Sequence, residues 1–170
     1  MQRKSFGNML CPIARSLECV GEWWSILILR DAFYGLKRFD EFQKSLGVAP
    51  NMLARRLNAL VAAGLLEKRR YSEHPPRGEY VLTERGRDFR PVLLALLAWG
   101  NRHFAHDGAA VALADVHTGA AVEPVLVDGA TGRRIDGPDF ALVAGPGADE
   151  GVRQRLAERG RRPFAPGGER

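Results

Sequence analysis

Apolar residues recur at helical spacing between residues 48 and 66, and they mark one face of a single predicted helix. The predicted buried stripe follows the i, i+4, i+7, i+8 pattern and consists of Leu53, Leu57, Leu60 and Val61. A rotation of about 100° per residue puts four other side chains on the opposite face. They are Asn51, Arg55, Asn58 and Ala62. Amides, a guanidinium and a methyl group suit contact with base edges in a DNA major groove, although the helix alone also fits an ordinary surface helix.

Three further helices are predicted upstream of this one. Pro12 begins a helix over residues 11–20 that ends at Gly21. Residues 22–34 are apolar nearly all round and predict a helix buried on several sides, at the centre of the core. Residues 39–46 keep a helical stripe, and Gly47 then makes a short turn before Pro50. Two helices joined by such a turn, the second with a polar face, form a helix-turn-helix pattern.

The periodicity becomes that of β-strands after Gly64. Residues 65–71 and 79–83 predict paired strands, and the prolines and glycine of residues 72–78 predict an irregular tip. The hairpin is basic and carries Lys68, Arg69, Arg70 and Arg77. A basic hairpin directly after such a helix predicts the wing of a winged-helix domain, with Arg77 suited to phosphate or minor-groove contact. A solvated hairpin with a charged tip is the alternative.

A longer helix is predicted over residues 84–103, with Thr83 as its cap. Pro91 lies inside it, which predicts either a kink or a start near Arg90. The apolar face of this helix is broad and needs a partner. The partner is either the same helix of a second subunit or the rest of the same domain.

The composition changes to Gly, Ala and Val from residue 108. Alternating runs at 110–116, 121–127 and 139–144 predict a small β appendage, residues 152–158 a short helical turn, and residues 159–170 a disordered basic tail. No internal repeat is apparent. The expected fold is therefore α+β, mainly α with small β. It comprises a winged helix-turn-helix domain over residues 1–107, a β-rich appendage over 108–158 and the tail.

Charge is concentrated in the predicted winged domain. Residues 1–107 contain 17 Lys and Arg against 11 Asp and Glu, whereas residues 108–170 contain 8 against 9. An excess of positive charge in the segment with the polar-faced helix favours a nucleic-acid partner. The longest apolar runs are far shorter than the roughly 20 residues that span a bilayer. We expect a cytoplasmic protein with no membrane partner and with Cys11 and Cys19 as reduced thiols.

These features favour a sequence-specific DNA-binding regulator without catalytic activity. Base contacts are predicted for Asn51, Arg55 and Asn58, with Met52 and Arg56 at the flanks of the helix face. Phosphate contacts are predicted for Lys37, Arg38, Lys68, Arg69 and Arg77. An enzyme finds no support, because no catalytic constellation or phosphate-binding loop is recognisable, and no cofactor is expected. A winged helix used only for protein interaction stays open.

The motifs together resemble the HxlR family of bacterial winged-helix transcription regulators. The resemblance covers about residues 11–101 and rests on CPIARSLECVGEWWSILILR, RFDEF, LARRLNALVAAGLLEKRRY, PPRGEYVLTERGR and LLALLAWG, in that order. It implies a homodimer on a palindromic double-stranded DNA operator. It also implies a dimer interface formed by the first and last helices of the domain, with Ile13, Leu17, Val92, Leu96, Trp99 and His103.

Cys11 followed by Pro12 matches the cysteine that senses quinones, aldehydes or oxidants in some members of this family. Such a role needs a thiolate stabilised by positive charge or a helix N-terminus, and Arg15 lies one turn away. A structural thiol, and control by a small ligand that binds without covalent reaction, stay open. We expect no intrachain disulfide with Cys19, because eight residues of a continuous helix span about 12 Å.

The appendage resembles a small zinc ribbon of some longer relatives, but it lacks the cysteines. Asp128 and Thr131 stand where the ligands of one knuckle belong, and His117 is isolated. Without thiolates the soft ligands of a closed zinc site are missing. We therefore expect a degenerate, metal-free ribbon held by packing alone.

Overall fold

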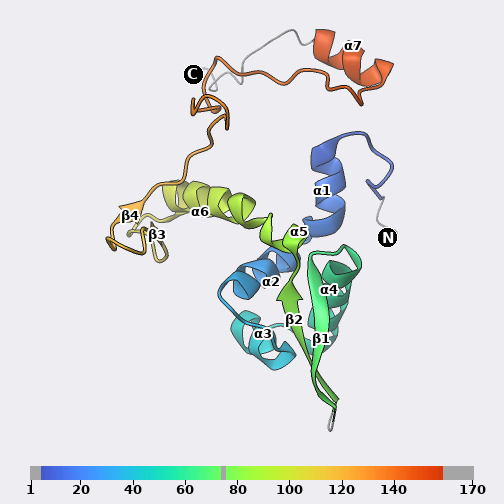
Figure 1. Cartoon of the computed structure of the whole chain (residues 1–170), viewed down its shortest axis with the longest axis vertical. Coiled ribbons are helices and arrows are strands. Elements are labelled where there is room, and N and C mark those ends of the chain that lie inside the picture. Colours follow the sequence, from blue (N-terminus) through green and yellow to red (C-terminus); the bar gives the residue numbers. More distant parts are fainter. Residues whose placement is uncertain (1–4, 74–75, 159–170) are drawn as a thin grey trace. The chain divides into compact units, whose positions relative to one another are not determined.

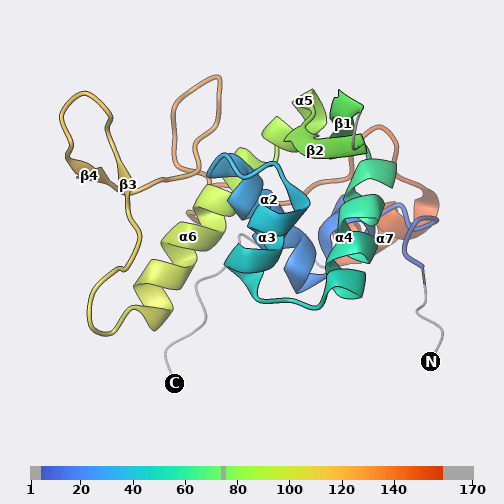
Figure 2. The ribbon, with the colours of Figure 1, turned by 90° about the horizontal axis from the view of Figure 1, so that it is seen from below.

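The computed structural model describes residues 5–73 and 76–158, and it divides the chain into two compact units, Met1–Ala110 and Val111–Arg170. The first unit begins with four helices: α1 (Pro12–Val20), α2 (Trp23–Phe33), α3 (Phe39–Leu46) and α4 (Pro50–Ala62). Helices α2, α3 and α4 pack against one another beside a two-stranded hairpin (Figures 1 and 2). The helix-turn-helix pattern and the two predicted proline starts, at Pro12 and Pro50, are present.

Glycines end the helices where the sequence predicts. Gly47 follows α3 in the left-handed conformation, with φ of 63°, and its amide donates to the Gln43 carbonyl at 2.9 Å. Gly64 reverses the chain after α4, with φ of 70°. These conformations carry a steric cost for any residue with a Cβ atom. They fix the tight turn between α3 and α4 and the sharp exit from α4 into the hairpin.

The hairpin consists of β1 (Leu66–Glu73) and β2 (Pro76–Leu82), paired antiparallel, with a register shift between Arg70 and Ser72. The expected irregular tip over residues 72–78 was wrong, because the pairing continues to Glu73 and Pro76. Each strand of a two-stranded ribbon has a free edge, where a proline without an N–H group is tolerated. The register shift accommodates the extra residue. Lys37 and Arg38 also join β2, since the Tyr80 amide donates to the Lys37 carbonyl at 2.7 Å.

The chain leaves the hairpin through two separate helices, α5 (Glu84–Arg87) and α6 (Arg90–Phe104). The cap at Thr83 is confirmed, because its Oγ1 accepts from the Gly86 amide at 3.0 Å. Of the two expectations for Pro91, the start near Arg90 is confirmed. The proline lies in the first turn of α6, where its missing N–H group costs no hydrogen bond.

One apolar cluster forms the core of the first unit. Its buried members are Val20, Ile28, Leu29, Phe42, Leu53, Leu57, Leu60, Leu65, Leu66 and Tyr80. Helix α2 supplies Ile28 and Leu29, so its central place is confirmed, but the expectation that it is buried on several sides was wrong at its start. Trp23 is 77% exposed there. Helix α6 contributes no buried residue, although Leu93 packs against the cluster.

The second unit contains much less regular structure than the sequence predicts. Its strands are β3 (Leu113–Ala114) and β4 (Ala121–Val122), and its helix is α7 (Glu150–Glu158). Val127 and Arg134 form an isolated bridge. Residues 139–144 form no strand, because alternating apolar residues stay unpaired when no neighbouring strand offers a hydrogen-bonded edge. The helical turn over residues 152–158 is present as part of α7. The predicted tail over 159–170 lies outside the described residues.

Two turns of the second unit have the same construction. Asp115 begins one Asp-x-x-Thr-Gly sequence and Asp128 the other. Each aspartate accepts hydrogen bonds from the amides two and three residues ahead. Each motif ends on a glycine with positive φ, 71° at Gly119 and 69° at Gly132. The repeat escapes a search for self-similarity because only three of its positions are shared.

Candidate nucleic-acid interface

Helix α4 presents two chemically different faces, as its sequence predicts. Leu53, Leu57 and Leu60 have no exposed surface, because they pack into the core cluster between α4 and its neighbours. The opposite face is exposed at all four predicted positions: Asn51, Arg55, Asn58 and Ala62. The helix packs against α1, α2, α3 and β1, and these contacts support its buried face from several sides. The polar face therefore stands on a rigid support.

Arg55 lies near the middle of the exposed face. Its Nη2 donates to the Met52 Sδ at 3.6 Å, and Met52 is half-buried. A thioether is a weak acceptor, so this contact orients the guanidinium without neutralising it. The side chain can exchange the sulfur for two acceptors of a base at small cost. Its geometry suits bidentate contact with guanine.

Arg56 does not stand on the exposed flank where the sequence analysis put it. Its Nη2 lies 2.9 Å from the Glu22 Oε2, and only 15% of its side chain is exposed. Its Nε is buried and makes no hydrogen bond to the described residues. A half-buried guanidinium that leaves its carboxylate would leave a buried charge behind. Arg56 therefore ties α4 to the start of α2.

The start of α3 offers two predicted phosphate ligands on a firm base. Glu41 accepts from the backbone amides of Lys37 and Arg38 at 2.9 and 2.8 Å, and these bonds lower the pKa of its carboxyl. The Arg38 guanidinium donates twice to Asp40, at 3.2 and 2.8 Å, and lowers the pKa of that carboxyl mainly by the side-chain hydrogen bond. Lys37 and Arg38 are both exposed. Local carboxylates hold the segment and leave its cations at the surface.

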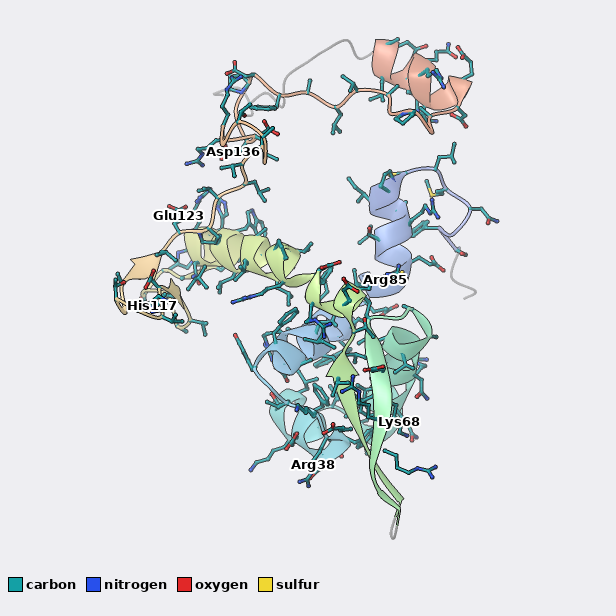
Figure 3. The ribbon with its side chains drawn as sticks, viewed as in Figure 1. Arg38, Lys68, Arg85, His117, Glu123 and Asp136 are labelled. Atoms are coloured by element: carbon teal, nitrogen blue, oxygen red, sulfur yellow. The ribbon has the colours of Figure 1, made fainter. Side chains whose placement is uncertain are left out.

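The first hairpin strand carries two more of the predicted phosphate ligands, Lys68 and Arg69. Arg69 donates from Nε to Glu67 at 2.8 Å, and the Lys68 ammonium lies 5.6 Å from the centre of the Tyr80 ring. Arg38 and Lys68 both lie toward the end of the unit from which the hairpin extends (Figure 3). The side chain of Arg77 lies outside the described residues. The structure thus brings Arg38, the N-cap residue of α3, and Lys68 of the hairpin to the same end of the unit.

Three exposed residues near this surface were missing from the predicted contact set. Ala59 lies on α4 next to the predicted face, Lys44 lies near the end of α3, and Arg70 lies on β1. Ala59 follows Arg55 by four residues, a spacing that could have identified it. A methyl group there allows a flat base edge to approach the helix closely.

The residues predicted for dimer contact are exposed on α1 and α6. Ile13 and Leu17 are 69% and 43% exposed, and the α6 members of the set are Val92, Leu96, Trp99 and His103. Trp99, His103 and Phe104 form an aromatic cluster with ring centres 5.0 to 6.4 Å apart. Cys11 is exposed and is the N-cap residue of α1. These faces have no partner among the described residues of the chain.

The aspartates and threonines of the second unit serve its own turns. Thr131 donates to the Asp128 carboxylate at 2.5 Å, and this bond is the main cause that lowers the pKa of Asp128. Among the described residues no group of three or more His, Cys, Asp or Glu side chains is placed to hold a metal ion. The same part of the chain contains no helix long and apolar enough to cross a membrane.

The chain is similar to known regulators over most of its length. A family model described as HxlR-like helix-turn-helix matches residues 19–108. An HTH-type transcriptional regulator of Mycobacterium tuberculosis is 37% identical over 136 residues, 79% of this chain and 86% of that protein. A solved transcription factor from Pseudomonas aeruginosa is 57% identical, with a TM-score of 0.64, and covers 86% of this chain and 100% of its own. That match covers more of the chain than the whole of the first unit, Met1–Ala110, so it includes part of the second unit.

A second solved structure matches a smaller share of the chain. The redox regulator HypR in its oxidized form is 33% identical, with a TM-score of 0.51. The match covers 55% of this chain and 97% of that protein.

Proposed function

The chain belongs to the HxlR-like helix-turn-helix family of DNA-binding transcriptional regulators, and on that premise we propose that it binds a palindromic operator as a homodimer. Helix α4 enters the major groove. The observation that carries this proposal is the exposed set of Asn51, Arg55 and Asn58 opposite a fully buried stripe. The family consists of regulators rather than enzymes, in agreement with the expectation from the sequence.

The proposed contacts divide into base readers and phosphate ligands. Arg55 reads guanine through O6 and N7, and Asn51 and Asn58 read adenine through N6 and N7. Lys37, Arg38, Lys68, Arg69 and Arg77 neutralise phosphates, and Met52 packs beside the base contacts. Asp40 and Glu67 keep two of these guanidiniums oriented before DNA arrives. Arg56 is left out of this set because Glu22 already holds it.

The sharpest test compares Arg55→Ala with Arg69→Ala on operator and random DNA. Loss of a bidentate base contact costs about 1–3 kcal/mol, so Arg55→Ala should weaken operator binding by about 5- to 150-fold and random DNA far less. Arg69→Ala should weaken both and lower the slope of log affinity against log salt by about one unit. The measurement is fluorescence anisotropy over a salt series. Equal losses on both DNAs for Arg55→Ala would remove it as a base reader.

The homodimer is proposed from the exposed apolar faces of α1 and α6. Helix α6 has no buried residue, although its sequence is rich in leucine and contains Trp99. Leu96→Glu should convert the dimer into a monomer in sedimentation equilibrium and weaken operator binding at least about tenfold, because two half-sites no longer bind as one. Leu142→Glu is the control, since Leu142 is also exposed but lies in the second unit. A variant at Leu96 that sediments like the wild type would contradict the proposed interface.

Cys11 is the proposed sensor of electrophiles. Its exposure at the start of α1 and the likeness to a redox regulator support this role. Addition of its sulfur to a quinone forms one C–S bond, and the thiol proton ends on a ring oxygen of the resulting hydroquinone. The quinone should release wild-type protein and Cys19→Ser from DNA but not Cys11→Ser. If Cys11→Ser is released equally, control by a ligand that binds without covalent reaction becomes the better proposal.

A further inference from the structure

The C-terminal end of α4 is held by a short segment that follows the wing. Three consecutive backbone carbonyls follow the last residue of α4, those of Ala63, Gly64 and Leu65. Residues 83–85 donate a hydrogen bond to each of them. Arg85 Nη1 donates to the Ala63 oxygen at 2.8 Å, and Thr83 Oγ1 donates to the Gly64 oxygen at 2.6 Å. The Thr83 amide donates to the Leu65 oxygen at 3.2 Å. Ala63 is the C-cap of α4, and a carbonyl at a helix C-terminus lacks a partner within the helix, so the bond from Arg85 satisfies a group that would otherwise need water.

The contact between the two segments is unusually close at Gly86. A Cβ atom at this position would lie 2.0 Å from the Leu65 oxygen, and the residue is buried. Only glycine allows α5 to approach the backbone after α4 to this distance. The two segments therefore contact each other through their backbones, and not only through long side chains.

Arg85 connects this junction to a third helix. Its Nη2 lies 3.9 Å from the Sγ of Cys19 on α1, and that thiol lies 3.8 Å from the Arg15 oxygen. The labelled Arg85 lies where α1 and α5 meet (Figure 3). Helix α5 continues into α6 after two residues. One guanidinium thus joins the end of α4 to α1 and to the segment that leads into α6.

We propose that Arg85 is a positioning residue that sets the angle at which α4 enters the major groove. The inference rests on the proposed function of α4. A guanidinium near a helix C-terminus also faces the negative end of the helix dipole, which strengthens its bond to the Ala63 carbonyl. A tilt of about 10° about that end would move Asn51, some 18 Å away along the axis, by about 3 Å. A bidentate base contact does not survive such a shift.

Arg87 provides a matched control on the same helix. It is exposed like Arg85, and its Nη1 donates to the Leu82 carbonyl at 2.8 Å, but that carbonyl belongs to β2 and not to the end of α4. Arg85→Met and Arg87→Met remove the same charge and one backbone hydrogen bond each. Arg85→Met should weaken operator binding about tenfold, change random-DNA affinity by less than about twofold, and leave the slope of log affinity against log salt unchanged to within about 0.3 unit. Arg87→Met should leave the ratio of operator affinity to random-DNA affinity unchanged. Arg85→Lys should retain part of the operator affinity that Arg85→Met loses.

Three outcomes would overturn the proposal. Equal effects of the two Met variants would show that α5 arginines act only on stability. A loss on both DNAs with a salt slope lower by about one unit would make Arg85 a phosphate ligand. Unchanged amide hydrogen exchange over residues 61–65 in Arg85→Met would show that Arg85 does not hold α4. Hydrogen exchange needs no DNA, so it tests the positioning role by itself. A wild-type protein that binds operator and random DNA equally would instead contradict the proposed function.

Discussion

The two units of this chain are stabilised in different ways. Among the described residues, the first unit buries ten apolar side chains in one cluster, whereas no residue of the second unit is buried. The second unit instead has its apolar side chains at the surface, with Val116 90% exposed and Val143 67% exposed. Its order comes from turns in which aspartates accept backbone N–H bonds. Burial makes the first unit cooperative, while each hydrogen-bonded turn of the second supports only its own neighbourhood.

The largest difference should appear when a leucine is truncated in each unit. Leu57→Ala removes a side chain with no exposed surface, so we expect the free energy of unfolding to fall by about 2–5 kcal/mol. Leu126→Ala removes one that is 54% exposed and should change it by less than about 0.5 kcal/mol. Urea unfolding followed by circular dichroism measures both. A cost above 2 kcal/mol at Leu126 would break the comparison, since it would reveal a core in the second unit.

A smaller effect is expected from glycines with the same backbone conformation. Gly47 ends α3 with φ of 63°, and Gly132 ends the second repeated turn with φ of 69°. An alanine at either position costs about 1–2 kcal/mol of local strain. Gly47→Ala should lower the melting temperature of the whole first unit. Gly132→Ala should speed hydrogen exchange only within residues 127–134. Faster exchange across the whole second unit would show that its turns are cooperative after all.

The pH dependence of the repeated turns should be weaker still and confined to acid. Hydrogen bonds from the backbone amides of Thr118 and His117 lower the pKa of Asp115 below the ordinary value of 3.8. The hydrogen bond from the Thr131 hydroxyl, with those from nearby amides, lowers the pKa of Asp128 in the same way. A lowered pKa means that the ionised carboxylate stabilises the folded turn above the unfolded pKa, and that this stabilisation is lost as the pH falls through the folded pKa. Amide shifts of Gly119 and Gly132 should titrate with midpoints below 3.8, and Asp→Asn variants should abolish the titration. Midpoints at or above 3.8 would contradict these hydrogen bonds.

The smallest expected effect is that of metal removal. Asp128 and Thr131 bond to each other, so neither is free to replace the thiolates of a ribbon knuckle. Incubation with a chelator, followed by addition of Zn²⁺, should leave the ¹H–¹⁵N NMR correlation spectrum of the second unit unchanged. Zinc-dependent shifts around Asp128 or His117 would show a metal site and would end the comparison with a metal-free, turn-supported unit.

The sequence predicted the first unit well because periodicity and helix-ending residues agree there. Leu53, Leu57 and Leu60 identified the buried face of α4, and Gly47 and Pro91 identified helix boundaries. Hairpin length was missed, because proline at a ribbon edge is compatible with pairing. The second unit was overpredicted, since alternating apolar residues indicate a strand only when a partner strand is available. Its repeated turns were missed, because side chains that cap a turn leave no hydrophobic pattern.

The sequence predicted which positions of α4 are exposed, but it did not predict which side chains bond to one another around the candidate site. The exposed positions of α4 follow from helical geometry alone, so Asn51, Arg55 and Asn58 could be assigned by spacing. The pairing of Arg56 with Glu22 joins residues 34 positions apart, and no local pattern reports it. The bonds of Arg85 to Ala63 and Cys19 were inaccessible for the same reason.

The tie between Arg56 and Glu22 also constrains how this sequence can change over evolutionary time. Replacement of the glutamate alone leaves the mostly buried Arg56 guanidinium without this carboxylate, and replacement of the arginine alone removes one cation from the start of α2. Either single step passes through a less stable regulator. Lineages that lose one residue should therefore replace the other too. Positions 22 and 56 are then expected to vary together, whereas position 55, the proposed base reader, has no such tie.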